Sequence, residues 1–215
     1  MPNRPYTSPA RERQAHATRL AILRAATELF VDQGYGPTPI SAIAQRAEVS
    51  VQTVYNAFGT KPALLKAAYD LTLAGDDAPL PLAERPEVKR LYALPDPVAF
   101  LHGYAELGRS LLDRLGPLSL RIAAGAAAGD PDLIDHQRIT DEERLVGTMF
   151  AARRVRELDA LAPDLTIERA RDRLWTLNSV QVWHLLTATR GWSSEEYASW
   201  IGDAMCAAVL APPTG

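Results

Sequence analysis

Residues 38–61, TPISAIAQRAEVSVQTVYNAFGTK, contain the pattern that decides the fold of this chain. Apolar residues recur at helical spacing over residues 40–47 and again over residues 51–58, which predicts two short helices. Thr38 is expected to cap the first helix, with Pro39 at the first helical position, and Ser50 to cap the second. The residues between the two runs break the period, so the sequence predicts a helix-turn-helix.

The outer face of the second helix has no apolar residue with which to pack. It carries Gln52, Thr53 and Asn56, small side chains that can hydrogen-bond to base edges in a major groove. The periodicity by itself also fits plain core structure in an all-α protein. DNA binding is therefore one of two interpretations that the spacing allows.

The longer run GYGPTPISAIAQRAEVSVQTVYNAFGTKPALL, residues 34–65, resembles the helix-turn-helix of the TetR family of bacterial transcriptional repressors. The matching features, in order, are a Gly before the capping Thr, Ile-Ala in the first helix, Val-Ser in the turn, Tyr-x-x-Phe, and a Lys followed by a Leu pair. The resemblance implies backbone-phosphate contacts by Tyr55 and Lys61. The full set of expected DNA-binding residues is Thr38, Ser41, Ser50, Gln52, Thr53, Tyr55, Asn56 and Lys61.

Two positions depart from the family pattern. Family members often carry a basic or polar contact residue where this chain has Ser41, and a His where it has Ala57. These departures suggest fewer contacts in each half-site, or a different set. They also leave open an alternative, a ligand-binding or protein-binding helical module whose helix-turn-helix no longer binds DNA specifically.

Composition places the chain in the all-α class. It has 215 residues, of which 47% are hydrophobic and 23% charged, and Ala, Leu, Arg and Glu recur at steps of three and four. The sequence contains no apolar run near the length of a membrane span, and its N-terminus lacks the apolar centre of a signal peptide. A cytoplasmic protein is expected.

The net charge of −3 is unevenly distributed along the chain. Residues 1–70 contain eight Lys or Arg and five Asp or Glu, a balance of +3, whereas residues 71–215 have a balance of −6. A basic N-terminal part on an acidic body is the asymmetry expected when only that part contacts phosphate.

Proline, glycine and capping residues predict the domain organisation. Residues 1–15 are expected to form a flexible basic arm, residues 16–74 a helix-turn-helix domain with a linking helix, residues 75–95 a Pro-rich linker, and residues 96–211 a helical bundle. Helices are predicted near residues 96–115, 117–128, 131–160, 166–190 and 194–210. A break is predicted at Gly116-Pro117, and capping is predicted for Thr166 and for Ser193 with Glu196.

The second domain is expected to bind a ligand and to dimerise. In the TetR family the last two helices form a dimer interface and the middle helices enclose an inducer, and the resemblance implies both here. One short recognition helix also contacts too few base pairs for useful specificity, which favours a homodimer on a palindrome. Each candidate lining residue also fits plain core, and the candidates are Phe100, Tyr104, Phe150, Trp175, Asn178 and Trp183.

No catalytic constellation and no metal-ligand spacing occurs in the sequence. The four histidines are widely separated, and neither a Gly-rich phosphate loop nor a Ser nucleophile elbow is present, so no enzyme activity and no cofactor are predicted. The sequence therefore predicts a homodimeric repressor that a small apolar effector releases from a palindromic operator in double-stranded DNA. It specifies neither the operator, the regulated genes nor the effector, and it leaves activation open.

Overall fold

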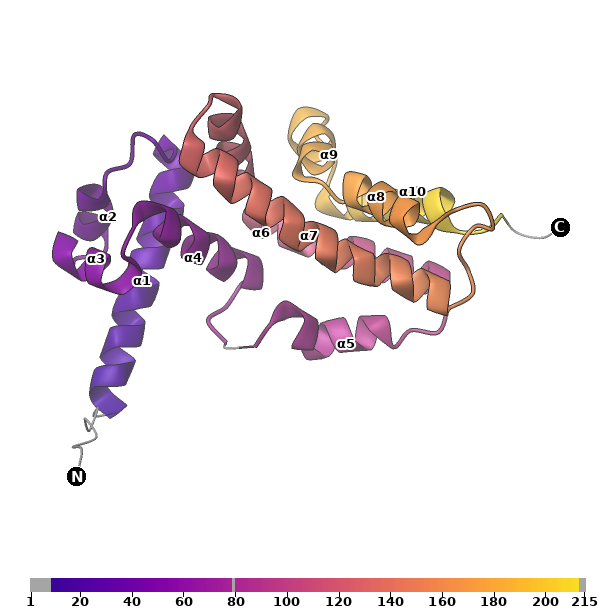
Figure 1. Cartoon of the computed structure of the whole chain (residues 1–215), viewed down its shortest axis with the longest axis horizontal. Coiled ribbons are helices and arrows are strands. Elements are labelled where there is room, and N and C mark those ends of the chain that lie inside the picture. The colour runs from indigo at the N-terminus through magenta and orange to yellow at the C-terminus, as the bar shows by residue number, and fades with distance from the viewer. Residues whose placement is uncertain (1–8, 79, 213–215) are drawn as a thin grey trace.

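The computed structural model describes residues 9–78 and 80–212, and these form a helical protein of two lobes (Figure 1). The elements are α1 (Pro9–Gln33), α2 (Ile40–Arg46), α3 (Val51–Phe58), α4 (Lys61–Ala74), the 3-10 turn η1 (Leu82–Glu84), α5 (Pro86–Tyr92), α6 (Pro97–Ala127), α7 (Pro131–Glu157), α8 (Ile167–Leu177), α9 (Val180–His184), the π-helical turn η2 (Leu185–Thr189) and α10 (Ser194–Val209). Within the described residues, no helix combines the length and the apolar character that crossing a membrane requires.

Helices α1 to α4 form the N-terminal lobe. Ile22, Ala26 and Phe30 of α1 are buried together with Leu64 and Leu65 of α4. The same apolar core continues into the second lobe through three buried residues of α6, which are Leu115, Leu118 and Ile122. Because the two lobes share this core, a displacement of α4 against α6 would be transmitted directly to the N-terminal lobe.

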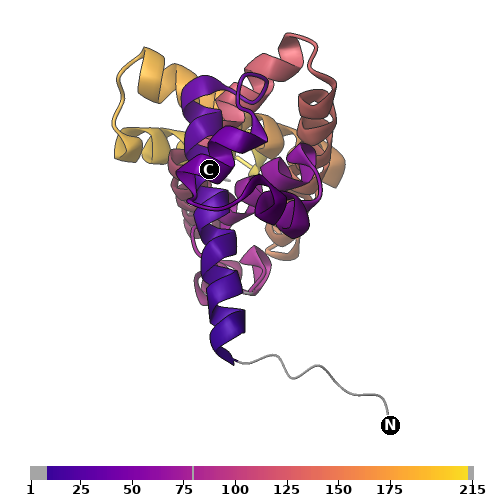
Figure 2. The same ribbon diagram turned by 90° about the vertical axis from the view of Figure 1, so that its left-hand side faces the viewer.

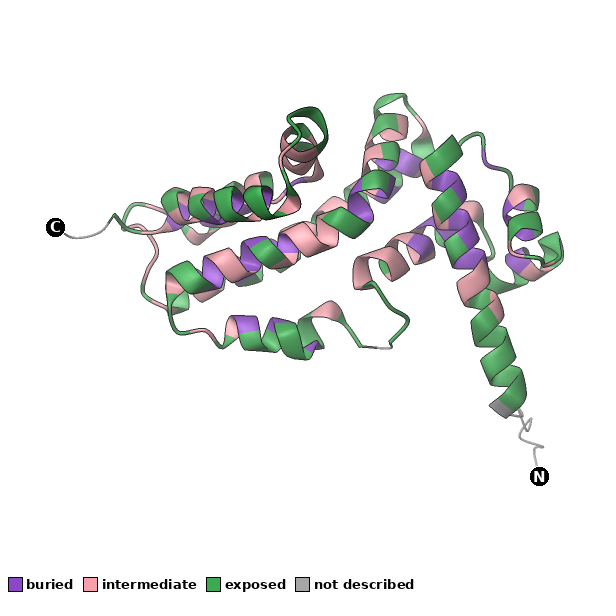
Figure 3. Cartoon of the chain, turned by 180° about the vertical axis from the view of Figure 1, so that it is seen from behind, coloured by how far each residue is buried: buried purple, intermediate pink, exposed green. Residues whose placement is uncertain are grey.

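Helix α1 begins at Pro9, so the prediction of a flexible arm over residues 1–15 is wrong for its second half. The first eight residues lie outside the described part of the chain. Proline fits the first turn of a helix, the following residues are good helix formers, and Glu12 in the first turn suits the helix dipole. This end of α1 extends beyond the other helices (Figure 2), and residues 10–17 are exposed (Figure 3).

The predicted break at Gly116-Pro117 does not occur, because α6 runs unbroken from Pro97 to Ala127. Proline normally disfavours a helix interior, since it lacks an N–H and crowds the preceding residue. Here the preceding residue is Gly116, which has no Cβ to crowd. A Cβ at Gly116 would lie 2.4 Å from Cζ3 of Trp183, so the ring of α9 occupies that space. Tertiary packing therefore holds the helix through its proline.

The single helix predicted for residues 166–190 is divided into α8, α9 and η2. Arg144 of α7 causes part of this division, because its Nη1 donates to the carbonyl oxygens of Trp175 at 2.8 Å and Asn178 at 2.9 Å. Ser179 then begins α9 by accepting a hydrogen bond from the backbone N–H of Val182. The carbonyl groups at the end of α8 thus have a side-chain partner, and a new helix can begin.

The segment between the lobes is more ordered than a linker. Arg85 and Asp76 form a bidentate ion pair, with N–O distances of 2.7 and 2.8 Å, that closes the loop after α4. Helix α5 follows and buries Val88 and Leu91. The expected Pro-rich linker over residues 75–95 therefore includes a short helix that packs on α6.

The turn between α2 and α3 contains a residue in a strained backbone conformation. Glu48 is exposed and has a φ of 55°, in the left-handed region that residues with a Cβ rarely adopt. Glu48→Gly is expected to raise the free energy of unfolding by about 0.5–1 kcal/mol, because the strain relieved exceeds the entropy that glycine adds to the unfolded chain. Urea unfolding measures this change. Glu48→Ala is the matched control, since it removes the carboxylate but keeps the Cβ, and an equal gain from both variants would contradict the explanation by strain.

Candidate DNA-binding surface and ligand cavity

Helix α3 presents one polar face to solvent. Val54 is buried and anchors the helix, whereas Gln52 and Asn56 are exposed on the opposite side, joined by a hydrogen bond of 2.8 Å from Nε2 to Oδ1. We call these two residues the recognition face. Their amide groups have the donors and acceptors that base edges in a major groove require.

Four further candidates belong to the same helix-turn-helix. Ser50 caps α3 as predicted, by accepting a hydrogen bond of 3.0 Å from the Thr53 N–H, and the two hydroxyl groups are 2.8 Å apart. The Thr53 hydroxyl is consequently already bonded. Tyr55 is exposed, as is Ser41 in the first turn of α2. Ser50 and Thr53 are thus bonded to each other at the start of α3, and Tyr55 and Ser41 are accessible to a partner.

Thr38 does not belong to this surface, and its predicted role as a cap is also wrong. Its side chain is completely buried, and the hydroxyl donates to the carbonyl oxygens of Gly34 at 2.7 Å and Leu29 at 3.3 Å. Pro39 is the N-cap residue of α2, and no side chain caps that helix. Thr38 instead satisfies carbonyl groups at the end of α1, so its hydroxyl is not available to a phosphate.

Lys61 lies at the start of α4 and is bonded within the chain. Its Nζ donates to the Tyr35 carbonyl oxygen at 2.6 Å and lies 4.1 Å from the centre of the Tyr35 ring. Burial lowers the pKa of the Lys61 ammonium group. The Tyr35 hydroxyl in turn donates to Asp132 in the first turn of α7 at 2.7 Å. Lys61 is therefore linked through Tyr35 to the second lobe.

Arg19 of α1 contacts the other end of α3. Its Nη1 donates to the Ala57 carbonyl oxygen at 3.1 Å, and its guanidinium carbon lies 4.3 Å from the centre of the Phe58 ring. A cation suits the carbonyl end of a helix. From the sequence, Arg19 is only a basic residue expected on the exposed side of α1. Nothing in the sequence indicates that its side chain contacts and positions α3.

A cavity of about 610 Å³ lies in the second lobe between α4, α5, α6, α7 and α9. Three of the predicted lining residues, Tyr104, Phe150 and Asn178, do line it. The prediction missed Tyr69 and Leu73 of α4, which form another part of the wall. Tyr69 follows Leu65 at a helical step of four, so continuing the apolar face of that helix would have identified it.

The other three predicted lining residues lie outside the cavity. Phe100 is completely buried between the rings of Tyr92 and Tyr104, at centroid distances of 5.2 and 6.3 Å. The Trp175 ring packs under the guanidinium group of Arg144 at 4.0 Å. Both are therefore packing residues, because the helices that carry them face other helices at those positions.

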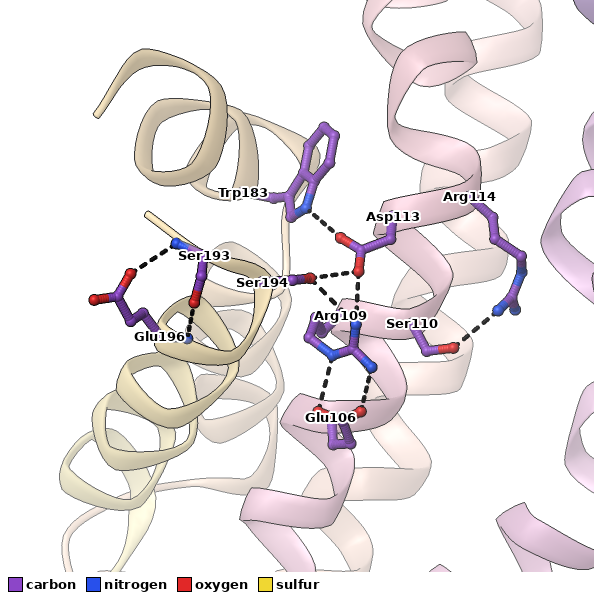
Figure 4. A network of polar contacts seen from close by, with 9 residues as sticks. All are labelled: Glu106, Arg109, Ser110, Asp113, Arg114, Trp183, Ser193, Ser194 and Glu196. Atoms are coloured by element: carbon purple, nitrogen blue, oxygen red, sulfur yellow. Dashed lines mark hydrogen bonds and ion pairs between the residues drawn. The ribbon is translucent and has the colours of Figure 1, made fainter. Parts of the chain in front are cut away.

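Trp183 is held by a polar network on α6 (Figure 4). Its Nε1 donates to Asp113 at 3.0 Å, and the same carboxylate accepts hydrogen bonds from Arg109 at 2.7 Å and from Ser194 of α10. Arg109 also pairs with Glu106. This network joins α9 and α10 to α6, so it fixes one wall of the cavity although Trp183 itself lies outside it.

His136 of α7 is a buried histidine next to the cavity wall. Its ring packs edge-on against Tyr69 at 5.1 Å, and its Nε2 has no hydrogen-bond partner among the described residues. Burial, together with the nearby Lys66 ammonium group, lowers the pKa of this imidazole to about 4, and Asp70 partly opposes the shift. The folded protein therefore holds His136 neutral.

This pKa predicts a loss of stability in acid. His136 takes up its proton near pH 6.5 in the unfolded chain but near pH 4 in the folded chain. Its contribution to the free energy of unfolding is therefore complete above pH 6.5 and is lost as the pH falls from 6.5 to 4. The loss is expected to be about 2–3 kcal/mol. Unfolding measured at several pH values should show that His136→Phe loses less stability in acid than the parent. The control His16→Gln, a change at an exposed histidine, should lose as much as the parent. An unchanged pH profile in His136→Phe would contradict the assignment.

The geometry defines a helix-turn-helix protein with a ligand-sized cavity, and comparison with known proteins agrees. Residues 22–68 match the profile of the family described as bacterial regulatory proteins, tetR family. The chain is 39% identical over 90 residues to the HTH-type transcriptional repressor Rv3405c of Mycobacterium tuberculosis. That alignment covers 37% of this chain and 48% of the relative, so the chain spans about half the length of the curated relatives it matches.

Solved structures share the fold over both lobes. The SmeT–triclosan complex superimposes with a TM-score of 0.68 at 20% identity and covers 90% of this chain and 92% of the other. A putative transcriptional regulator from Saccharomonospora viridis in complex with choline gives a TM-score of 0.67 at 20% identity, with 90% and 98% covered. At this identity the structures show the fold. The match to the TetR family is carried by the helix-turn-helix segment, residues 22–68.

Proposed function

We propose that this chain is a DNA-binding transcriptional regulator, a repressor that a small molecule releases from a palindromic operator. The observation that carries the proposal is the exposed pair Gln52 and Asn56, on a helix anchored by buried Val54 within the segment that matches the family. Ser41, Tyr55 and Lys61 complete the proposed DNA surface. On binding, the Lys61 ammonium group would leave the Tyr35 carbonyl oxygen and pair with a DNA phosphate. The matched regulators are not enzymes, and we propose no catalytic activity here.

The proposed regulator acts as a homodimer, because two recognition helices related by a twofold axis are needed to read a palindrome. The face that supports dimerisation includes Leu185 and Trp200, which are 56% and 42% exposed. Trp192 packs edge-on against Trp200 at 5.9 Å. Large exposed apolar groups mark interaction sites, and tryptophan is a frequent anchor of interfaces.

Release by a ligand follows from the position of α4. This helix begins with Lys61 beside the DNA surface and lines the cavity with Tyr69 and Leu73. Arg121 of α6 also donates to the Val31 carbonyl oxygen near the end of α1 at 2.7 Å. A ligand that binds better to a displaced arrangement of α4 shifts the population toward dimers whose recognition helices no longer fit the operator.

The test of the proposed function is binding of the purified protein to the DNA immediately upstream of its own coding region, with excess non-specific competitor. Competitor-resistant, salt-sensitive binding would support a sequence-specific regulator. If that DNA is not bound, selection from random duplexes distinguishes a distant operator from a helix-turn-helix that has lost specific DNA binding. Failure to enrich any sequence would favour the second function, a ligand-binding or protein-binding module, which the residues at Ser41 and Ala57 suggest.

The proposed dimer face predicts the effect of a single substitution. Trp200→Glu is expected to weaken dimerisation by about 30-fold or more, since an interface anchor contributes at least about 2 kcal/mol and the carboxylate adds a desolvation cost. Sedimentation equilibrium over a concentration series measures this change. Ile134→Glu is the matched control, because Ile134 is 48% exposed on α7 and outside the proposed face. Equal effects of both substitutions would argue against this face.

A further inference from the structure

The cavity in the second lobe has mainly apolar walls. Leucines of α6 form one side, and Val146 and Phe150 of α7 lie at its edge, 58% and 53% exposed. Large apolar side chains are costly to expose, and here they lie beside a cavity of about 610 Å³, within the size range of sites for small molecules. The part of the wall that a ligand would cover is therefore apolar.

The most deeply placed charge in this wall, Arg144, is already neutralised within the protein. Its Nη1 donates to the carbonyl oxygens that end α8, its Nη2 lies 3.3 Å from Asp141, and its guanidinium group packs on the Trp175 ring. Asp141 is paired by the same contact. Moving Arg144 toward an anionic ligand would leave the end of α8 without its partner, so Arg144 and Asp141 together offer no free charge to the cavity.

The remaining charges lie at the rim. Glu143 is 3.1 Å from Lys66, which also pairs with Asp70 at 2.6 Å. Lys89 of α5 is exposed and remains in contact with water. A charged group bound inside the cavity would thus lose its hydration without gaining an opposite charge, and burying an unpaired charge is strongly unfavourable.

The polar groups that do face the cavity are uncharged. Burial raises the pKa of the Tyr69 and Tyr104 hydroxyl groups, so both remain protonated and able to donate. The Tyr104 hydroxyl lies 3.5 Å from Thr148, a long hydrogen bond that a ligand oxygen could replace. The Asn178 amide lies over Gly108, where a Cβ would be 2.3 Å from its Oδ1. These groups suit a hydroxyl or carbonyl group on an apolar molecule.

We propose that the cavity binds an uncharged, mainly apolar molecule that carries a hydroxyl or carbonyl group, in preference to a carboxylate or a quaternary ammonium ion of the same size. The identification of this molecule as the effector rests on the proposed function, whereas its binding does not. The choline and triclosan complexes named above belong to other proteins, and the charges of this chain's own cavity favour a neutral ligand.

The test is calorimetric titration of the full chain, without DNA, with 1-decanol, decanoate and decyltrimethylammonium below their aggregation concentrations. These probes share an alkyl chain and differ in charge. Decanol is expected to bind at least about tenfold more tightly than either ion. Equal or tighter binding of an ion, or no binding of decanol, would overturn the proposal.

A pair of matched variants tests whether decanol binds in the cavity. Ala123 lines it and Ala124, its neighbour on α6, is exposed, so Ala123→Phe should abolish decanol binding and Ala124→Phe should not. Leu111→Phe is a second filling variant in case the first does not fold, as judged by circular dichroism. Retained binding in a folded filling variant would contradict the site. If decanol binds but does not release the protein from its operator, the ligand class stands and the effector role fails.

Discussion

Replacing Gln52 and Asn56 together by alanine is expected to lower the operator affinity of the dimer by about 10³-fold or more. Each amide that pairs with a base edge contributes about 1–3 kcal/mol of discrimination, and the substitution removes two such amides from each half-site. In the free protein the two amides bond to each other, so their removal leaves no buried polar group unpaired. The folded state should therefore be little affected.

Competition titration of the operator against a scrambled duplex measures this loss of affinity. Affinity for the scrambled duplex should change little, because non-specific binding depends on phosphate contacts. Gln45→Ala, an exposed glutamine on α2, is the matched control. A double variant that keeps the base preference of the parent would show that another surface reads the DNA.

Operator affinity is also expected to fall by about 10³ to 10⁵ between 50 and 200 mM salt, if the dimer makes about six to ten phosphate contacts. Counterions released from the DNA cause this dependence, and the N-terminal part of the chain supplies the basic groups. Titrations at several salt concentrations give the slope. A slope near zero would argue against phosphate contacts and for a module without DNA binding.

Lys61→Ala separates two roles of that lysine. If Lys61 binds a phosphate in each half-site, the variant lowers the salt slope by about one for each phosphate that it no longer neutralises. If Lys61 serves only to bond the Tyr35 carbonyl oxygen, the slope stays the same and the stability falls. Lys89→Ala is the control, because Lys89 lies on α5, outside the N-terminal lobe.

Local patterns predicted the features that depend on neighbouring residues in the chain. Ser50 caps α3, Thr166 caps α8, and Ser193 with Glu196 forms the predicted capping box of α10. A cap is decided by residues two or three positions apart, so the sequence carries the whole interaction. The helix-turn-helix was identifiable for the same reason.

The sequence patterns predicted helix ends and caps wrongly where a side chain distant in the chain contacts the helix. A Gly-Pro pair such as Gly116-Pro117 usually ends a helix. Here α6 stays continuous, because Leu115 and Leu118 are buried and the Trp183 ring packs against Gly116. Conversely, Arg144 ends a helix whose own residues would allow it to continue. Thr38 is a residue type that often caps helices. Here it is buried instead, and its hydroxyl donates to the Gly34 carbonyl oxygen just after α1.

By itself, the sequence determined the all-α class, the helix-turn-helix and the polar face of α3, since helical period, capping and exposed amides are local properties. Only the tertiary structure decided which aromatic residues line the cavity, because that depends on which side of each helix meets another. Phe100, Trp175 and Trp183 are as apolar as Phe150, yet partners distant in the chain remove the first three from the cavity wall. The same packing pairs the charges of that wall, and so decides the chemistry of the proposed ligand.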